Sequence, residues 1–228
     1  MIAIVQARLN STRLPNKILF KIKNKTMIEI IYKRLKKSKT LNDIIFAIPD
    51  DKKNKKLENL LKNLKIKYFK GSNLNVLERY YQTATNFGAK NIVRVTSDCP
   101  LIDTTILDKM VRIFKKKNID YISNNNPPSF PHGMDLEIFK YKVLNKAFHE
   151  AKSKRDKEHV TYYITRNKRK FKIKNFKNKI NLSKIRITLD YLNDYKIIKA
   201  LFDYFYPNIY FGINEISKLY KTNPKIFK

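Results

Sequence analysis

The chain opens with Met1-Ile-Ala-Ile-Val-Gln-Ala-Arg-Leu-Asn-Ser-Thr-Arg-Leu-Pro-Asn-Lys-Ile-Leu-Phe20, and the rest of its organisation is built around this opening. The apolar run from Ile2 to Val5 is long enough for a buried strand and too short for a helix. The residues that follow are mostly polar, and Pro15 prevents a helix from running through the middle of them. The opening therefore predicts a first strand that ends in an irregular polar loop.

This polar loop is a candidate site for a phosphate-bearing ligand. It carries three cations and several hydroxyl or amide groups, namely Arg8, Asn10, Ser11, Thr12, Arg13 and Lys17. In open α/β sheets, ligands bind where loops leave the carboxyl ends of the strands. Arginine offers a planar fork and lysine a point charge, a combination that suits a bent triphosphate better than a flat carboxylate. A solvated basic loop in a lysine-rich protein is the alternative that the loop alone leaves open.

Downstream of the loop, apolar residues alternate between helical and strand spacing. Thr26 and Glu29 form a capping-box pattern at the start of the first helix. We expect helices at 26–37, 50–64, 75–87 and 104–116, and strands at 44–48, 66–69, 91–95 and 120–123. Strands that alternate with helices in this way favour a parallel sheet with helices on both faces.

The second half of the chain is less regular. A long segment rich in Asn and Pro, Asn124–Pro131, is of the length that often forms a lid or a partner contact, and we hypothesise that it supports a homodimer. Beyond a strand ending near Phe139, we expect helices at 155–167 and 194–204, strands at 171–176 and 184–189, and then one small helix with a frayed end. Because no internal repeat or Gly/Ser linker occurs, we expect a single domain over 1–228, with core motifs in 1–205 and a helical tail over 206–228.

Composition narrows the function classes. Lys and Arg number 50 against 19 Asp and Glu, a net charge of +31, which favours anionic ligands. The lysines are scattered through every segment instead of forming one stripe, so no specific nucleic-acid role is expected. No apolar run reaches the ~18 residues of a membrane span, so no membrane insertion is expected. A single cysteine, Cys99, and the lack of a signal-peptide pattern favour a reducing cytoplasmic location.

Two aspartates follow predicted strands and are candidate metal ligands. Asp98 comes directly after the strand at 91–95, and Pro100 ends that strand, so Asp98 is displayed at the same edge as the opening loop. A turn cap is the simpler role, but next to a triphosphate a carboxylate is well placed to hold Mg²⁺. Asp190 follows the predicted strand at 184–189, and both acids could reach one metal if their strands are neighbours. Cys99 is expected to pack in the core.

The segment His132-Gly-Met-Asp-Leu-Glu137 suggests a polar substrate pocket. Strand alternation places Asp135 and Glu137 on one face, and Gly133 allows a ligand to approach closely. Two carboxylates there suit the hydroxyls of a sugar, although hydrogen bonding by a solvated edge strand would use the same pattern. His159 lies near a predicted helix start, where a lone His is more often structural than a base, and its spacing does not form a zinc site.

Six blocks of sequence, in this order, resemble the CMP-sugar-acid synthetases. They are Ile4-Val-Gln-Ala-Arg-Leu-Asn-Ser-Thr-Arg-Leu-Pro-Asn-Lys17, Gly71 with Val76-Leu-Glu-Arg-Tyr80, Val93-Arg-Val-Thr-Ser-Asp-Cys-Pro-Leu-Ile102, Pro131-His-Gly-Met-Asp-Leu-Glu137, Glu158-His-Val-Thr161 and Arg186-Ile-Thr-Leu-Asp190. The resemblance is to the branch of spore-coat polysaccharide biosynthesis cytidylyltransferase-like proteins, related to the CMP-KDO and CMP-sialate synthetases. It implies an α/β, Rossmann-like nucleotidyltransferase fold, similar to the glycosyltransferase-A type, with a mostly parallel central sheet.

The resemblance also implies roles for the matching residues. The nucleotide-binding set would be Ala7, Arg8, Ser11, Arg13, Lys17, Arg79, Arg94 and Thr96. Arg8 and Lys17 would be catalytic together with Asp98 and Asp190, and the two aspartates would hold Mg²⁺ as cofactor. The sugar pocket would contain His132, Gly133, Asp135, Glu137, Glu158 and His159. The chain departs from the family at Asn75, where similar proteins usually carry an acid.

The implied reaction joins CTP and a sugar acid to give a CMP-sugar and pyrophosphate, for surface polysaccharide or glycan biosynthesis. A glycosyltransferase is the nearest alternative, because it uses the same type of fold and also places a strand-end Asp on a metal. Such an enzyme would not need three cations for a triphosphate. A basic nucleic-acid-binding protein is an alternative from another class, supported only by the net charge of +31. A scaffold without activity is disfavoured by the presence of both Asp98 and Asp190.

Overall fold

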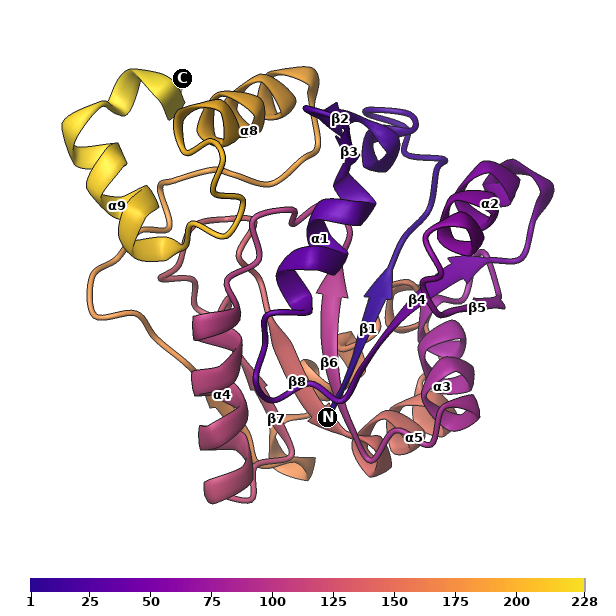
Figure 1. The fold of residues 1–228 in the computed structure, drawn as a ribbon. Coiled ribbons are helices and arrows are strands. Elements are labelled where there is room, and N and C mark those ends of the chain that lie inside the picture. The colour runs from indigo at the N-terminus through magenta and orange to yellow at the C-terminus, as the bar shows by residue number, and fades with distance from the viewer. Residues whose placement is uncertain (228) are drawn as a thin grey trace.

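The fold is given by a computed structural model that describes residues 1–227, so that Lys228, the last residue of the predicted tail, lies outside the described residues. Its centre is a seven-stranded sheet with the order β5-β4-β1-β6-β8-β7-β9 and helices on both sides (Figure 1). The strands are β1 (Ile2–Gln6), β4 (Asp43–Pro49), β5 (Tyr68–Gly71), β6 (Asn91–Thr96), β7 (Tyr121–Ser123), β8 (Glu137–Lys140) and β9 (Ile173–Asn175).

The strand directions place most loops of interest at one edge of the sheet. β1 pairs in parallel with β4 and β6, β4 with β5, and β7 with β9, whereas β8 is antiparallel to β6 and β7. The carboxyl ends of β1, β6, β7 and β9 therefore share an edge with the amino end of β8. The chain moves from β1 to β4 on one side and later returns to β6 on the other, and ligands bind at such switch points. The prediction of a mostly parallel sheet is confirmed.

Two apolar layers cover the sheet because strand side chains alternate between its faces. Ala3 and Val5 belong to one buried cluster, and Ile4 belongs to the other. The first cluster includes side chains of α1 (Met27–Leu35), α2 (Lys55–Asn63), α4 (Thr104–Lys116), α8 (Leu192–Tyr204) and α9 (Ile213–Thr222). The second includes those of α3 (Val76–Asn86), α5 (Tyr141–Glu150) and α7 (Tyr162–Arg166). Helices on both faces are thus confirmed.

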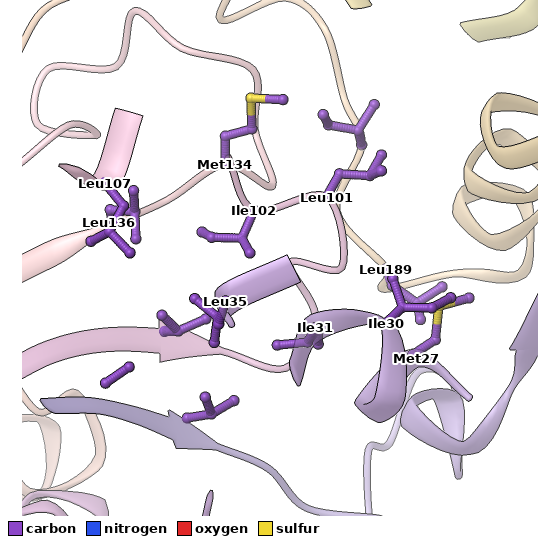
Figure 2. Close-up of a cluster of buried hydrophobic side chains, with 14 of the residues drawn as sticks. Met27, Ile30, Ile31, Leu35, Leu101, Ile102, Leu107, Met134, Leu136 and Leu189 are labelled. Carbon is purple, nitrogen blue, oxygen red and sulfur yellow. The ribbon is translucent and has the colours of Figure 1, made fainter. Parts of the chain in front are cut away.

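Part of the first cluster anchors the loops that carry the candidate metal ligands (Figure 2). Apolar side chains of α1 pack there with residues from the segments that follow Asp98 and precede Asp190. The labelled members are Met27, Ile30, Ile31, Leu35, Leu101, Ile102, Leu107, Met134, Leu136 and Leu189. Truncating one such buried Leu or Ile to Ala typically lowers the free energy of unfolding by about 2–5 kcal/mol. The packing of this cluster therefore stabilises the backbone segments that carry both aspartates.

The C-terminal segment is part of the core. α9 confirms the predicted small helix, but 224–227 form a 3₁₀ turn whose Phe227 packs against the core, so the expected frayed end is wrong for the described residues. The buried guanidinium of Arg34 donates to the carbonyls of Ile102 (2.9 Å) and Phe211 (2.8 Å) and so joins the tail to the loop after β6. Burial lowers the pKa of Arg34 to about 10.

Three further elements differ from the sequence-based expectations. The helix expected at 155–167 is two short helices, α6 (Lys154–Glu158) and α7, separated at His159–Thr161. The helix α5 was not predicted, although Val143, Leu144 and Ala147 recur at helical spacing. A short hairpin of β2 (Lys21–Ile22) and β3 (Lys25–Thr26) leads into α1, whose Thr26–Glu29 capping box is confirmed.

The segment 184–189 is extended, but it forms no strand of the sheet, so that expectation is also wrong. It makes one isolated bridge, between Arg186 and His132, and is not part of the seven-stranded sheet. Ile187 N donates to His132 O at 2.8 Å, and Leu189 N donates to Asp98 O at 2.8 Å. These two bonds bring Asp190 close to Asp98 without a shared strand ladder. Among residues 1–227, no helix combines the length and the apolar character needed to cross a membrane.

Candidate active site

A pocket of about 280 Å³ lies at the carboxyl ends of β1 and β6, where the strand order reverses. It brings together most of the predicted site residues: Ala7, Arg8, Ser11, Arg13, Lys17, Arg79, Arg94, Thr96, Asp98, Glu158 and His159. Its lining also contains Thr12, another residue of the opening loop, and three residues outside the predicted set, Gln6, Val76 and Ser97. The predicted residues His132, Gly133, Asp135, Glu137 and Asp190 are not part of the lining. The opening loop, the end of β6 and the end of α6 therefore converge as expected.

The opening loop is held in place by its own backbone and by Asn54. Asn54 is buried, and its Oδ1 accepts a hydrogen bond from Leu9 N at 2.9 Å. Asn16 N donates to Leu9 O at 3.0 Å, and Asn16 has a left-handed backbone with φ of 57°, a conformation that Asn tolerates well. Arg8 is exposed and makes no ion pair with a described residue. The loop is thus ordered while its first cation remains available to an anion.

A cluster around Asp190 forms the cationic side of the pocket; we call Asp190, Arg13, Lys17 and Arg186 the Asp190 cluster. Asp190 Oδ1 lies 2.7 Å from Arg13 Nη2 and 2.9 Å from Lys17 Nζ. Lys17 Nζ also donates to Leu189 O at 2.6 Å and lies 3.9 Å from Asp98 Oδ2. Burial alone would raise the pKa of Asp190, but the hydrogen bond and charge of Lys17, with the charges of both arginines, hold this pKa below its ordinary value. Asp190 is therefore ionised at neutral pH and lies behind Lys17.

Asp194, on α8, holds Arg186 and the backbone next to Asp190 in place. Its carboxylate accepts two bonds from Arg186, at 2.8 Å from Nε and 2.9 Å from Nη2. Asp194 Oδ2 also accepts from Asp190 N at 2.8 Å and from Tyr191 N at 2.9 Å, which fixes the turn into α8. Arg186 Nη1 lies 3.1 Å from His132 Nδ1. His132 is exposed beside this cluster rather than on the pocket wall.

A second carboxylate assembly, the Glu137 cluster, lies beneath the pocket and consists of Glu137, Arg94, Tyr121 and Thr161. Arg94 Nη1 forms an ion pair with Glu137, and the hydroxyls of Tyr121 and Thr161 donate to Glu137 Oε1, at 2.6 Å for Thr161. Glu137 is only 5% exposed. Burial would raise its pKa, but the charge of Arg94 and these hydrogen bonds lower it overall. Because its donors leave it no open face, the expectation that Glu137 faces the sugar is not supported.

Gly133 and Asp135 also differ from their expected placement. Gly133 has φ of 109°, and a Cβ there would lie 2.5 Å from Thr188 N and 2.6 Å from Ile187 O. The close approach that this glycine permits is thus used by the 187–188 backbone and not by a ligand. Asp135 is half-buried next to Asp98. Burial raises the pKa of Asp135, and the charges of Asp98 and Glu137 add to this effect.

Arg79 is a buried cation of the pocket wall, and it has no ion pair with a carboxylate among residues 1–227. It is 2% exposed, its Nη1 donates to Ser72 O at 2.5 Å, and its Nε has no hydrogen-bond partner there. Burial lowers the pKa of Arg79 to about 10, and the charge of Arg8 adds to this effect. A desolvated, unpaired cation in a pocket wall favours an anionic or carbonyl ligand. Asn75, the departure from the family pattern, caps α3 by accepting from Glu78 N at 3.1 Å.

Glu158 and His159 reach the pocket from the end of α6. Both are exposed, and no side-chain hydrogen bond of either occurs among the described residues. Their position depends on Asp156, whose carboxylate accepts from Arg166 Nε at 2.9 Å and from Nη2 at 2.8 Å and thereby locks α6 to α7. Thr161, between the two helices, extends this support to the Glu137 cluster.

The acid set fits a cation that is shared with a phosphate ligand. Within residues 1–227, no three His, Cys, Asp or Glu side chains gather into a metal site. Asp98 and Asp190 nevertheless flank one ammonium, that of Lys17, so both carboxylates can face a single cation. Mg²⁺ is usually held by one or two carboxylates together with substrate phosphates, which these two residues match. The thiol of Cys99 is buried and its pKa is raised by burial, which suits the expected packing role.

Comparisons with known proteins agree with this geometry. The sequence profile of a family described as cytidylyltransferase matches residues 2–227. An uncharacterized protein of Methanocaldococcus jannaschii is 37% identical over 99% of this chain and 92% of its own. The spore coat polysaccharide biosynthesis protein SpsF of Bacillus subtilis is 28% identical over 87% of this chain and 85% of its own. The resemblance found in the sequence blocks is confirmed.

A solved structure confirms the fold. A cytidylyltransferase from Leptospira borgpetersenii serovar Hardjo-bovis superimposes with a TM-score of 0.95 at 33% identity, covering 99% of this chain and 96% of that one. The likeness spans both the sheet and the C-terminal helices. The α/β nucleotidyltransferase fold is therefore established for residues 1–227.

Proposed function

The chain belongs to the cytidylyltransferase family, and from this premise we propose that it transfers the cytidylyl group of CTP to a sugar acid, giving a CMP-sugar and pyrophosphate. The observation that carries the proposal is the convergence of Arg8, Arg13 and Lys17 with Asp98 on one pocket. A glycosyltransferase would not need this concentration of cations, since its donor carries no triphosphate. The resemblance to CMP-KDO and CMP-sialate synthetases supports a sugar acid as acceptor.

In the proposed reaction, a sugar hydroxyl oxygen attacks the α-phosphorus in line. A new P–O bond forms as the hydroxyl loses its proton to solvent, the bond between the α-phosphorus and the bridging oxygen breaks, and pyrophosphate leaves with its electron pair. Catalysis of such transfers is mainly positioning and charge stabilisation. Arg8, Ser11 and Arg13 would orient the triphosphate, and Lys17 would stabilise the charge that develops on pyrophosphate. The unpaired guanidinium of Arg79 would contribute to nucleotide binding from the opposite wall.

Asp98 and Asp190 would hold Mg²⁺ together with the phosphates, and the ion when bound would polarise the α-phosphate and lower the pKa of the attacking hydroxyl. The fit is supported by the position of Lys17 Nζ, 2.9 Å from one carboxylate and 3.9 Å from the other. In this arrangement the ammonium of Lys17 can turn from Asp98 to a phosphate oxygen and keep its ion pair with Asp190.

On the sugar side, we propose that Glu158 and His159 contact the acceptor, with His132 and Asp135 at its margin. Glu137 would act through Arg94 and not by contact with the sugar. Thr96 would lie near the nucleoside. We further propose a single domain over 1–228 in the cytoplasm, serving surface polysaccharide or glycan biosynthesis, and a homodimer through Asn124–Pro131. One buried cluster that runs from Ala3 to Leu219 supports the single domain.

Pyrophosphate release measures the proposed reaction directly. The protein would be incubated with CTP, Mg²⁺ and a panel of sugar acids, with UTP and with UDP-sugars as alternative donors. We expect release with CTP and at least one sugar acid, and we expect Asp98→Asn to remove most of the turnover while the thermal midpoint is retained. Near-wild-type turnover of Asp98→Asn at saturating Mg²⁺ would contradict the metal role, and transfer from a UDP-sugar would favour a glycosyltransferase.

A further inference from the structure

Gln6, the last residue of β1, lies in the pocket wall and has no role in the mechanism above. Its Oε1 accepts a hydrogen bond from Arg94 Nη2 at 3.0 Å, and the other end of the same guanidinium, Nη1, is paired with Glu137. The three residues stand on adjacent strands. β1 pairs with β6 and β6 with β8, and Arg94 is in direct register with Glu137. A continuous polar chain therefore runs from the sealed carboxylate of Glu137 to the pocket.

The hydrogen bond from Arg94 determines the orientation of the Gln6 amide. A guanidinium has donors and no acceptor, so the Gln6 atom facing Arg94 must be the carbonyl oxygen. The Gln6 NH₂ group then points away from Arg94, and no hydrogen bond from it to another described residue occurs. Rotating the amide by a half-turn would place NH₂ against the guanidinium, donor against donor. Gln6 thus presents a hydrogen-bond donor to the pocket and cannot exchange it for an acceptor.

Glu137 stabilises the contact between Arg94 and Gln6. Because Glu137 neutralises Arg94 in a buried site, Arg94 is not drawn toward the phosphates of a ligand, and its second amino group stays on Gln6. Tyr121 and Thr161 in turn hold the carboxylate of Glu137. Arg79, which lacks such a partner, is free to serve an anion. Arg79 and Arg94 therefore have different tasks in the pocket, and that of Arg94 is positioning.

We infer that Gln6 selects the nucleobase by donating a hydrogen bond to N3 of cytosine. This inference rests on the proposed function. The phosphates already have the cations of the opening loop, whereas a neutral, fixed donor matches a neutral acceptor best. N3 is an acceptor in cytosine and carries a proton in uracil, whereas O2 is an acceptor in both bases. A fixed donor directed at N3 therefore favours CTP over UTP.

The test is a titration calorimetry measurement of CTP and UTP affinity for the full chain without sugar acid. The informative variant is Gln6→Glu, which keeps the shape and can accept from Arg94 but presents an acceptor to the pocket. The added charge weakens both nucleotides, so the readout is the ratio of the two affinities. We expect wild-type protein to prefer CTP, and we expect Gln6→Glu to reduce this preference by about 10- to 100-fold, the usual effect of losing one buried hydrogen bond.

Two controls keep the result interpretable. Arg8→Ala should weaken CTP and UTP equally and leave their ratio unchanged, because in the proposed function Arg8 binds only phosphate. Gln6→Met removes the donor without adding charge, and it should also lower the ratio of CTP affinity to UTP affinity. It replaces Gln6→Glu as the test if circular dichroism shows that Gln6→Glu is poorly folded. A wild-type preference for CTP that survives both Gln6 variants would overturn the inference alone. A wild-type protein that binds no nucleotide, or binds UTP as tightly as CTP, would overturn the inference and the proposed function together.

Discussion

The Asp190 cluster and the Glu137 cluster lie at the same sheet edge and are both built on a carboxylate paired with arginine, yet they differ in what surrounds the pair. Glu137 meets one cation and two hydroxyls and is almost sealed. Asp190 meets three cations, and one of them, Arg13, is half-exposed. The sealed assembly has no charge left for a ligand, whereas the cation-rich assembly has an excess that a triphosphate can use. The Glu137 cluster thus supports the pocket structurally, and the Asp190 cluster takes part in its function.

Removing the charge of Glu137 should produce the largest effect on stability. Glu137→Gln leaves the guanidinium of Arg94 without a counter-charge in a buried site, and such a change typically costs about 3–5 kcal/mol. We expect urea-induced unfolding to show a loss of this size. An unfolding free energy equal to that of the wild type would mean that solvent reaches Arg94, and the contrast between the two clusters would not hold.

Removing the charge of Asp190 should instead act mainly on turnover. Asp190→Asn is expected to lower the rate of pyrophosphate release by about 10²- to 10³-fold, in the range for losing one group that stabilises transition-state charge. The loss in unfolding free energy should be smaller, about 1–2 kcal/mol, because Arg13 can turn into solvent. The rate of pyrophosphate release and the free energy of unfolding are measured on the same preparation. A variant that is strongly destabilised but fully active would reverse the roles assigned to the two clusters.

Asp156 joins α6 to α7 next to the Glu137 cluster, and its effect on stability should depend on pH. The hydrogen bond from Arg166 lowers the pKa of Asp156 below its ordinary value. A lowered folded-state pKa contributes stability above the unfolded-state value of about 3.9, and the contribution is lost as pH falls through the folded-state pKa. We expect Asp156→Asn to cost about 1–3 kcal/mol near neutral pH.

The same difference between wild type and Asp156→Asn should shrink below about pH 4, where the Asp156 carboxylate of the unfolded chain begins to be protonated while that of the folded protein is still ionised. Unfolding curves of both proteins at several pH values measure this. A difference that is constant down to the lowest pH would show that the Asp156–Arg166 pair contributes packing and not charge.

The smallest expected effect comes from one hydroxyl of the sealed cluster. Thr161→Val removes a single donor to Glu137 while Tyr121 and Arg94 remain, so a loss of about 1 kcal/mol is expected. Thr165→Val, which removes a hydroxyl bonded to the local helix backbone, is the matched control. Equal effects of the two substitutions would indicate that Thr161 contributes only local helix energy.

Sequence reasoning identified the first strands, the helices at 27–35, 76–86 and 104–116, and the cations of the opening loop, because these depend on local periodicity and on Pro15. It could not separate Glu137 from Asp190, since both acids are buried and the partners that distinguish them come from distant parts of the chain. The burial of Glu137 depends on Tyr121 and on Thr161, which come from other parts of the chain.

Gln6 and Gly133 illustrate the same limit. Gln6 is a neutral amide at a strand end, and its importance arises from an arginine two strand positions away on β6. The only signal in the sequence was its position directly before Ala7 and Arg8. Gly133 was expected to let a ligand approach closely, but the backbone of 187–188, which is distant in the sequence, occupies that space.

The most direct measurement of the central claim is the thermal midpoint of the full chain with CTP, UTP, GTP, ATP, dTTP and UDP-sugars, each with and without Mg²⁺. A ligand that binds the folded state raises this midpoint by mass action, and the identity of the sugar acid is not needed. A pocket that combines a triphosphate loop, Asp98 and the Gln6 donor predicts a Mg²⁺-dependent increase that is largest with CTP. Small equal increases with every polyanion, abolished by salt, would contradict it and assign the binding to the net charge of +31 alone.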